Sequence, residues 1–109
     1  MRNLVRTFRA LGDATRQRLL ALLESAGELC VSDLARNFDM TQPSVSHHLR
    51  ILKDADLVTA HKRGKEVYYA VNPQELSQCC GTFFAQFACC RPLLKRVRRK
   101  ALATVKREV

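Results

Sequence analysis

DLARNFDMTQPSVSHHLRILKD, residues 33–54, is the segment whose pattern decides the fold. Its first six residues have the pattern of a brief helix, and Asp39-Met40 is the expected turn. Thr41 then offers a hydroxyl cap to a longer helical pattern, and Pro43 lies in the first turn of that helix, where backbone amides lack partners anyway. The segment therefore predicts two helices joined by a tight turn.

The residues before this segment add two more predicted helices. Residues 4–11 have helical spacing, and a second helix is expected between a cap at Asp13 and a stop at Gly27. The short apolar stretch ELCV follows, and Ser32 is the expected cap of the brief helix.

The residues after the segment change from helical to alternating spacing. Residues 57–71 are rich in β-branched and aromatic side chains around Gly64, which predicts a β-hairpin. The predicted elements follow the order of a winged helix-turn-helix: a short helix, a turn, a longer helix and a hairpin. In that fold the second helix enters the DNA major groove, and the hairpin, called the wing, reaches a flanking backbone. The predicted fold class is therefore mainly α with a small β-hairpin wing.

Helical spacing returns over residues 74–90, and Pro92 separates this last helix from a basic C-terminal segment. We therefore expect a DNA-binding and dimerisation domain over residues 1–91 and a basic tail over residues 92–109. At 109 residues the chain is expected to form one domain, and chains this short often dimerise for stability.

The charge balance points to an anionic polymer as partner. Lysine and arginine number 19 against 10 acidic residues, and eight of the basic residues lie within residues 91–109. An ordinary solvated terminus is the alternative explanation for that tail. No run of about 18 apolar residues is present, and charges interrupt the N-terminus, so no membrane association and a cytoplasmic location are expected. In a reducing compartment the five cysteines are expected to be thiols.

The longer helix has one apolar face and one polar face. At about 100° per residue, Val45, Leu49 and Leu52 share one side, whereas the residues that point away carry groups able to reach phosphates and base edges. These residues are Ser44, Ser46, His47 and Arg50. A solvated helix surface is the alternative. His48 lies at the border of the apolar face and is predicted to be a histidine at the edge of the core.

The predicted wing has a concentration of positive charge at its tip. Lys62, Arg63 and Lys65 surround Gly64, and three cations at a tight turn repel one another unless an anion approaches. Phosphate is the expected anion.

These motifs together resemble the ArsR/SmtB family of bacterial metal-responsive repressors, and arsenic-type ArsR most of all. The resemblance covers residues 4 to about 90 and rests on LGDATRQRLLALL, ELCVSDLA, SVSHHLRILKDADLV and GKEVYY. It implies a homodimer, joined through terminal helices, that binds an inverted repeat in double-stranded DNA and leaves it when a thiophilic metal binds. It also implies DNA-facing positions at Gln42, Ser44, Ser46, His47 and Arg50, with the wing from Arg63 to Lys65.

One motif departs from the family. Arsenic-sensing members often have Cys-Val-Cys where this chain has Cys30, Val31 and Ser32. A serine hydroxyl is a poor ligand for a soft metal, which leaves two roles open for Cys30: a metal ligand, or a small buried apolar residue.

Two cysteine pairs, Cys79-Cys80 and Cys89-Cys90, lie in the last predicted helix. Eleven residues at about 1.5 Å per residue would separate Cys79 from Cys90 by roughly 16 Å on one helix. In the family that the chain resembles, this helix meets its symmetry mate antiparallel, and an axis near position 84.5 would pair Cys79 with the partner's Cys90. The predicted site therefore combines Cys79 and Cys80 with the partner's Cys90, and Cys89 is a further candidate ligand.

Thiolates without a nearby histidine or carboxylate favour soft ions. As(III) or Sb(III) is the preferred inducer, Cd(II) or Pb(II) would also fit, and Zn(II) remains open if Cys89 completes a set of four. The alternatives are cysteines that merely pack at an interface, and a thiol-based repressor that senses oxidants or reactive sulfur. An enzyme is not expected, because no nucleophile, base and orienting group occur together, and no small-molecule substrate is predicted. Metal storage is disfavoured by the complete DNA-binding pattern.

Overall fold

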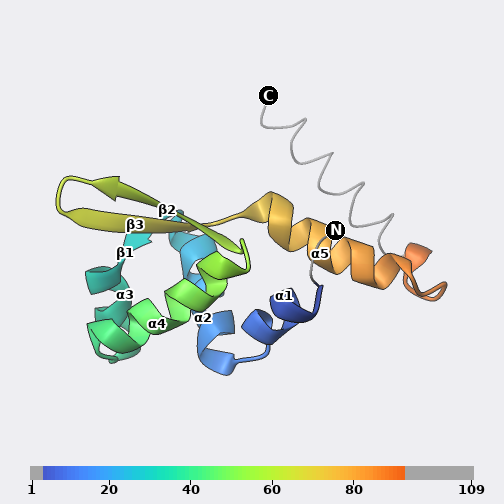
Figure 1. The fold of residues 1–109 in the computed structure, drawn as a ribbon, viewed down its shortest axis with the longest axis horizontal. Helices are drawn as coiled ribbons and strands as arrows, with labels where there is room; N and C mark the ends of the chain where they lie inside the picture. The colour runs from blue at the N-terminus through green and yellow to red at the C-terminus, as the bar shows by residue number, and fades with distance from the viewer. Residues whose placement is uncertain (1–3, 93–109) are drawn as a thin grey trace. The chain divides into compact units, whose positions relative to one another are not determined.

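The computed structural model describes residues 4–92 and confirms the mainly α fold with a small β-hairpin wing (Figure 1). The chain divides into two compact units between Leu76 and Ser77. Within the described part, no helix is long and apolar enough to span a bilayer. The predicted basic tail lies outside the described residues, except for Pro92. In chain order the elements are α1 (Leu4–Leu11), α2 (Ala14–Ala26), β1 (Leu29–Cys30), α3 (Val31–Phe38), α4 (Gln42–Asp54), β2 (Val58–Arg63), β3 (Glu66–Val71) and α5 (Pro73–Ala85).

Local signals place most of the helix ends where the sequence predicts them. The Asp13 side chain accepts a hydrogen bond from the Arg16 backbone N–H at 3.0 Å and caps α2. Thr41 does the same for α4, accepting from the Ser44 N–H at 3.3 Å. Gly27 ends α2 with a φ of 90°, a conformation that glycine adopts without a Cβ clash.

The start of α3 differs from the prediction. Ser32 does not cap this helix, because α3 begins at Val31 and Cys30 occupies the cap position. The physical reason is a short strand that the sequence did not reveal: β1 pairs with β3, with Leu29 opposite Tyr69 and Cys30 opposite Tyr68. Pairing keeps the Cys30 backbone extended, so the helix starts directly after the strand.

The predicted hairpin is confirmed and is part of a three-stranded antiparallel sheet of order β1-β3-β2. Strands β2 and β3 pair from Val58 opposite Val71 to Arg63 opposite Glu66. Gly64 and Lys65 form the tip, where Gly64 has a φ of 60°. Figure 1 shows the hairpin projecting from one side of the helices, with β1 beside β3.

The core of the first unit is built mainly from leucine side chains that have lost all contact with solvent. Each such side chain contributes about 1.5–3 kcal/mol relative to an exposed position. These side chains fix α4 against the helices before it and the segment that leads into β2. They are Leu19, Leu23, Leu34, Val45, Leu49, Leu52 and Leu57.

Leu49→Ala is expected to lower the free energy of unfolding by about 3 kcal/mol, because truncation removes buried methyl groups and leaves a cavity. Ile51→Ala is the matched control, since Ile51 lies on the same helix but is only half-buried. It should cost about 1 kcal/mol. Urea unfolding at one fixed protein concentration measures both variants. Equal losses at the two positions would contradict the placement of Leu49 in the core.

The last helix is shorter than predicted. Instead of continuing to Cys90, α5 ends at Ala85, and tight turns follow in which the Cys90 N–H donates to the Phe87 carbonyl at 3.0 Å. The Ala85 carbonyl accepts from Arg91 Nε at 3.1 Å, and this contact caps the end of the helix. The expected placement of Cys79 and Cys90 roughly 16 Å apart on one helix is therefore wrong, because Cys90 lies beyond the end of α5.

Candidate nucleic-acid interface and thiol pairs

Helix α4 presents a continuous polar face. Its buried side, formed by Val45, Leu49 and Leu52, packs in the core and fixes the rotation of the helix about its axis. All five residues predicted to face DNA on this helix are exposed, four of them away from its buried side and Gln42 in the first turn. This polar face of α4 consists of Gln42, Ser44, Ser46, His47 and Arg50.

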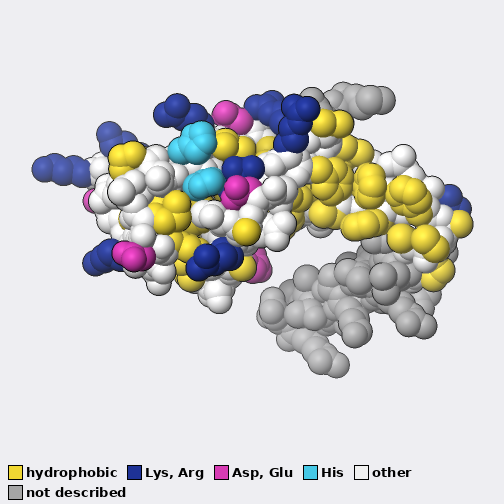
Figure 2. Space-filling model, turned by 90° about the horizontal axis from the view of Figure 1, so that it is seen from below, with side chains coloured by type: hydrophobic (Ala, Val, Ile, Leu, Met, Phe, Trp, Pro, Cys, Tyr) yellow, Lys and Arg dark blue, Asp and Glu magenta, His cyan; other side chains and the backbone are white. Residues whose placement is uncertain are grey.

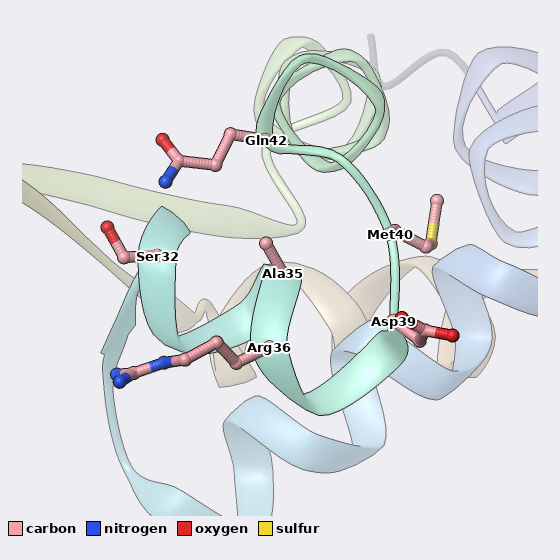
Figure 3. Close-up of a pocket in the computed structure, with 6 residues that line it drawn as sticks. All are labelled: Ser32, Ala35, Arg36, Asp39, Met40 and Gln42. Atoms are coloured by element: carbon pink, nitrogen blue, oxygen red, sulfur yellow. The ribbon is translucent and has the colours of Figure 1, made fainter.

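A hollow lies between α3 and the start of α4, at the end of the polar face (Figure 3). It has a volume of about 590 Å³ and is open to solvent. Gln42, Ser32 and Arg36 extend to the same side of the hollow in Figure 3, whereas Asp39 and Met40 lie on the loop at the other side. An amide, a hydroxyl and a guanidinium are groups that bind phosphate oxygens.

Ser32 and Arg36 were not predicted as DNA-facing residues. They lie four residues apart on α3 and therefore one above the other on a single helical face. This spacing was the available signal in the sequence, but the DNA-facing residues were predicted only on the second helix of the motif and on the wing. Arg36 also pairs with the Asp33 carboxylate.

Arg16, near the start of α2, connects three helices. Its Nε donates to the Ala10 carbonyl at 2.6 Å and its Nη2 to the Arg9 carbonyl at 3.0 Å, which satisfies carbonyls at the end of α1. Its Nη1 lies 3.3 Å from Nδ1 of His48 on α4. The hydrogen bond from the Arg16 amide, aided by the positive guanidinium, lowers the pKa of Asp13. His48 is half-buried, in agreement with its predicted place at the edge of the core.

The wing contains an ion pair that the sequence did not reveal. Arg63 pairs with Glu28, which precedes β1, and its guanidinium also lies 4.9 Å from the centre of the Tyr68 ring. His61 Nε2 lies 3.3 Å from the same Glu28 carboxylate. Lys65 is exposed and has no ion-pair partner within residues 4–92. Arg63 and Lys65, the two predicted phosphate contacts of the wing, therefore differ in charge available to a phosphate. Glu28 partly neutralises Arg63 but not Lys65.

The cysteines of each pair lie side by side. The Sγ atoms of Cys79 and Cys80 are 3.8 Å apart on α5, and those of Cys89 and Cys90 are 3.7 Å apart in the turns that follow. Cys79 is fully buried and Cys89 is exposed, while Cys80 and Cys90 are intermediate. The hydrogen bond with the Cys89 thiol raises the pKa of Cys90. Within residues 4–92, no three histidine, cysteine, aspartate or glutamate side chains converge as a metal site.

Cys30 has a separate structural role. Its side chain is 6% exposed, and its Sγ donates to the Asp33 carboxylate at 3.2 Å. This hydrogen bond, together with Arg36, lowers the pKa of Asp33. The thiol is thus engaged as a donor at the start of α3.

Three aromatic side chains cluster in the segment between the two cysteine pairs. The Phe83 ring contacts those of Phe84 and Phe87, with centroids 5.5 and 5.3 Å apart. Phe84 and Phe87 nevertheless remain 41% and 46% exposed. Figure 2 shows hydrophobic side chains gathered over the α5 segment.

Residues 13–60 match the family described as bacterial regulatory protein, arsR family. Two curated relatives are similar over about the same part of the chain. The transcriptional repressor SdpR of Bacillus subtilis (strain 168) is 42% identical over 65 residues, which cover 60% of this chain and 71% of that protein. The arsenical resistance operon repressor of Escherichia coli (strain K12) is 41% identical over 69 residues, covering 63% of this chain and 59% of that protein, so the match spans less than two thirds of its length.

Two solved structures have the same fold. One, described as a possible transcriptional regulator for arsenical resistance, is 35% identical with a TM-score of 0.65, over 84% of this chain and 92% of that one. The other is the solution structure of a homodimeric winged helix-turn-helix DNA-binding domain from Mycobacterium bovis. It is 26% identical with a TM-score of 0.64, over 75% of this chain and 76% of that one.

Proposed function

Because this chain belongs to the arsR family of bacterial regulatory proteins, whose members are transcriptional regulators and not enzymes, we propose that it represses transcription as a homodimer on an inverted-repeat operator. We further propose that it leaves the operator when trivalent arsenic or antimony binds its cysteine pairs.

The polar face of α4 is the observation that carries the DNA-binding proposal. It combines two serine hydroxyls, an amide, an imidazole and a guanidinium on the exposed side of a helix whose other side is buried. The hollow beside Gln42 would take a backbone phosphate between Ser32 and Arg36, where the N-terminus of α4 adds a favourable dipole. The net formal charge of +9 supports attraction to DNA.

The proposed dimer partner is a second copy of this chain. Large aromatic side chains that remain more than 40% exposed, as Phe84 and Phe87 do, are costly in water unless another surface covers them. A homodimer would also place two copies of α4 on successive turns of the major groove, about 34 Å apart, which is the spacing that an inverted repeat supplies. The homodimeric neighbour supports a dimer.

The donor set of the cysteine pairs fits a thiophilic ion. Soft thiolate ligands select As(III), Sb(III) and similar ions over harder cations. Each pair offers two sulfur atoms less than 4 Å apart, and neither pair gains a third ligand within residues 4–92. We therefore propose that Cys79 and Cys80 bind the ion together with Cys90, or Cys89, of a second subunit.

The raised pKa of Cys90 favours a metalloid over a divalent metal. A divalent cation must displace thiol protons, and the raised pKa of Cys90 opposes this. Arsenous acid instead condenses with thiols and releases water, with no net change in protons.

By linkage, an ion that binds the free dimer better than the DNA-bound dimer lowers DNA affinity by the same factor.

The proposal is tested by measuring DNA release from the reduced protein with As(III), Sb(III), Cd(II), Pb(II), Zn(II) and hydrogen peroxide side by side. We expect As(III) and Sb(III) to act at the lowest concentrations. Release by peroxide at lower concentrations than As(III) would instead support a thiol-based redox repressor, because neighbouring thiols can be oxidised to a disulfide. Release by Cd(II), Pb(II) or Zn(II) first would support a sensor of divalent metals.

Lys65→Gln is expected to weaken binding to every DNA duplex alike and to make its salt dependence shallower by about one unit, because one phosphate contact is lost. Arg63→Gln should have a smaller effect, since Glu28 already neutralises part of that charge. Glu28→Gln is the matched control and should strengthen DNA binding by freeing Arg63. Fluorescence anisotropy over a range of salt concentrations measures all three. A loss confined to one DNA sequence would mean that the wing contacts bases.

A further inference from the structure

The contact between Arg16 and His48 determines which ring nitrogen of His48 carries a proton. A guanidinium only donates hydrogen bonds, so His48 Nδ1, 3.3 Å from Arg16 Nη1, must be the acceptor. The neutral ring then carries its proton on Nε2. Arg16 cannot easily turn away, because the carbonyls of Arg9 and Ala10 hold the same guanidinium and its side chain is 13% exposed.

The position of His48 on α4 directs this proton outward. At about 100° per residue, His48 lies about 40° from Ser44, at the flank of the polar face of α4. Nδ1 is turned toward Arg16, and Nε2 lies on the opposite ring edge, where no acceptor within residues 4–92 reaches it. When a helix enters the major groove, its centre meets the bases and its flanks meet the sugar-phosphate backbone.

We infer that Arg16 is a positioning residue that holds His48 as a neutral Nε2–H donor to a DNA phosphate oxygen at the flank of the polar face. This inference rests on the proposed function and adds a contact to it. The residues of the polar face are exposed, whereas His48 is half-buried. His48 extends the interface toward the junction of α1 and α2, through a side chain whose ring lies against Arg16.

The first test needs no DNA. In protein labelled with ¹⁵N at histidine, NMR identifies which nitrogen of the His48 ring is protonated at neutral pH. We expect the proton on Nε2 in the wild type and a mixture of the two neutral forms in Arg16→Gln. A proton on Nδ1 in the wild type overturns the inference. Because the wild-type result decides this point, instability of the Arg16 variant does not affect the test.

The second test compares two amides at position 48 on the same duplex DNA. The amide of His48→Gln reaches the place of Nε2, whereas that of His48→Asn reaches only the place of Nδ1 and keeps the contact with Arg16. We expect His48→Gln to stay within about threefold of wild-type affinity and His48→Asn to lose about tenfold on every sequence alike, the usual effect of one hydrogen bond. Thermal unfolding should show both variants folded.

The salt dependence separates this role from others. A neutral donor releases no counterion, so the slope of log affinity against log salt should be the same in His48→Asn as in the wild type. A slope shallower by about one unit would overturn the neutral form. A loss limited to one sequence would overturn the phosphate contact. If the wild type binds no duplex at all, the proposed function fails and the DNA contact with it, whereas the NMR result still reports the tautomer.

Discussion

Replacing both His47 and Arg50 with alanine should lower affinity for the operator by roughly 100- to 1000-fold. Both side chains lie on the exposed polar face of α4, and a good base contact contributes about 1–3 kcal/mol. The operator can be selected from a pool of random duplexes by the wild-type protein. Fluorescence anisotropy of both proteins on that duplex measures the effect.

The control for this prediction is Arg50→Lys, which keeps the charge but loses the planar, two-pronged donor of arginine. It should retain most of the affinity for random DNA and lose part of the preference for the operator. Circular dichroism should show that both variants are folded, since neither side chain belongs to the core. Unchanged operator affinity in the double variant would rule out the placement of α4 in the groove.

Removing either cysteine pair should abolish the response of DNA binding to arsenite while leaving DNA binding itself intact. Cys79→Ser/Cys80→Ser and Cys89→Ser/Cys90→Ser each replace soft ligands with hydroxyls. Each variant should need at least about 100-fold more arsenite for release from DNA. Losing a residue that only supports a metal ligand already lowers metal affinity by up to about 100-fold. Cys30→Ser is the control, because a serine hydroxyl can still donate to Asp33.

Mixed dimers test whether the ion bridges two subunits. Combining the Cys79/Cys80 variant with the Cys89/Cys90 variant should give heterodimers with one complete site, one bound ion per dimer and three sulfur ligands by X-ray absorption. Each variant homodimer should bind weakly. Native stoichiometry and DNA release in either homodimer would place the ligands elsewhere.

The proposed thiol chemistry also predicts that the binding of Cd(II) and the binding of arsenite depend differently on pH. Thiol protons must leave before Cd(II) binds, so its affinity should rise with pH over the range below the raised pKa of Cys90. Arsenite binding should change little over the same range. A parallel rise for both ions would contradict the proposed thiol chemistry.

Features that depend on neighbouring residues were predictable from the sequence. The caps at Asp13 and Thr41, the turn at Gly64 and the polar face of α4 each follow from residue types at short spacing. The family could be recognised from the sequence for the same reason, because the motifs that carry the resemblance are local. The part of the candidate site that lies on one helix was therefore visible before the structure.

Contacts between distant residues were not predictable in this way. Arg63 meets Glu28 across 35 positions, and Arg16 meets His48 across 32, with no periodic signal in the sequence between them. The end of α5 was missed because no glycine or proline marks it. At that end, the Ala85 carbonyl accepts a hydrogen bond from the Arg91 side chain.

In the proposed function, the ion pair between Arg63 and Glu28 would affect how the protein finds its operator. The Glu28 carboxylate competes with DNA phosphates for the Arg63 guanidinium. A wing that binds DNA as proposed would therefore hold random DNA less firmly than its charge alone predicts, and its residence time at each wrong site would be shorter. Because proteins of this kind slide and hop along DNA, shorter stops mean a faster search. In the proposed repressor, Glu28 would thus weaken binding to random DNA and shorten the search for the sequence that α4 binds.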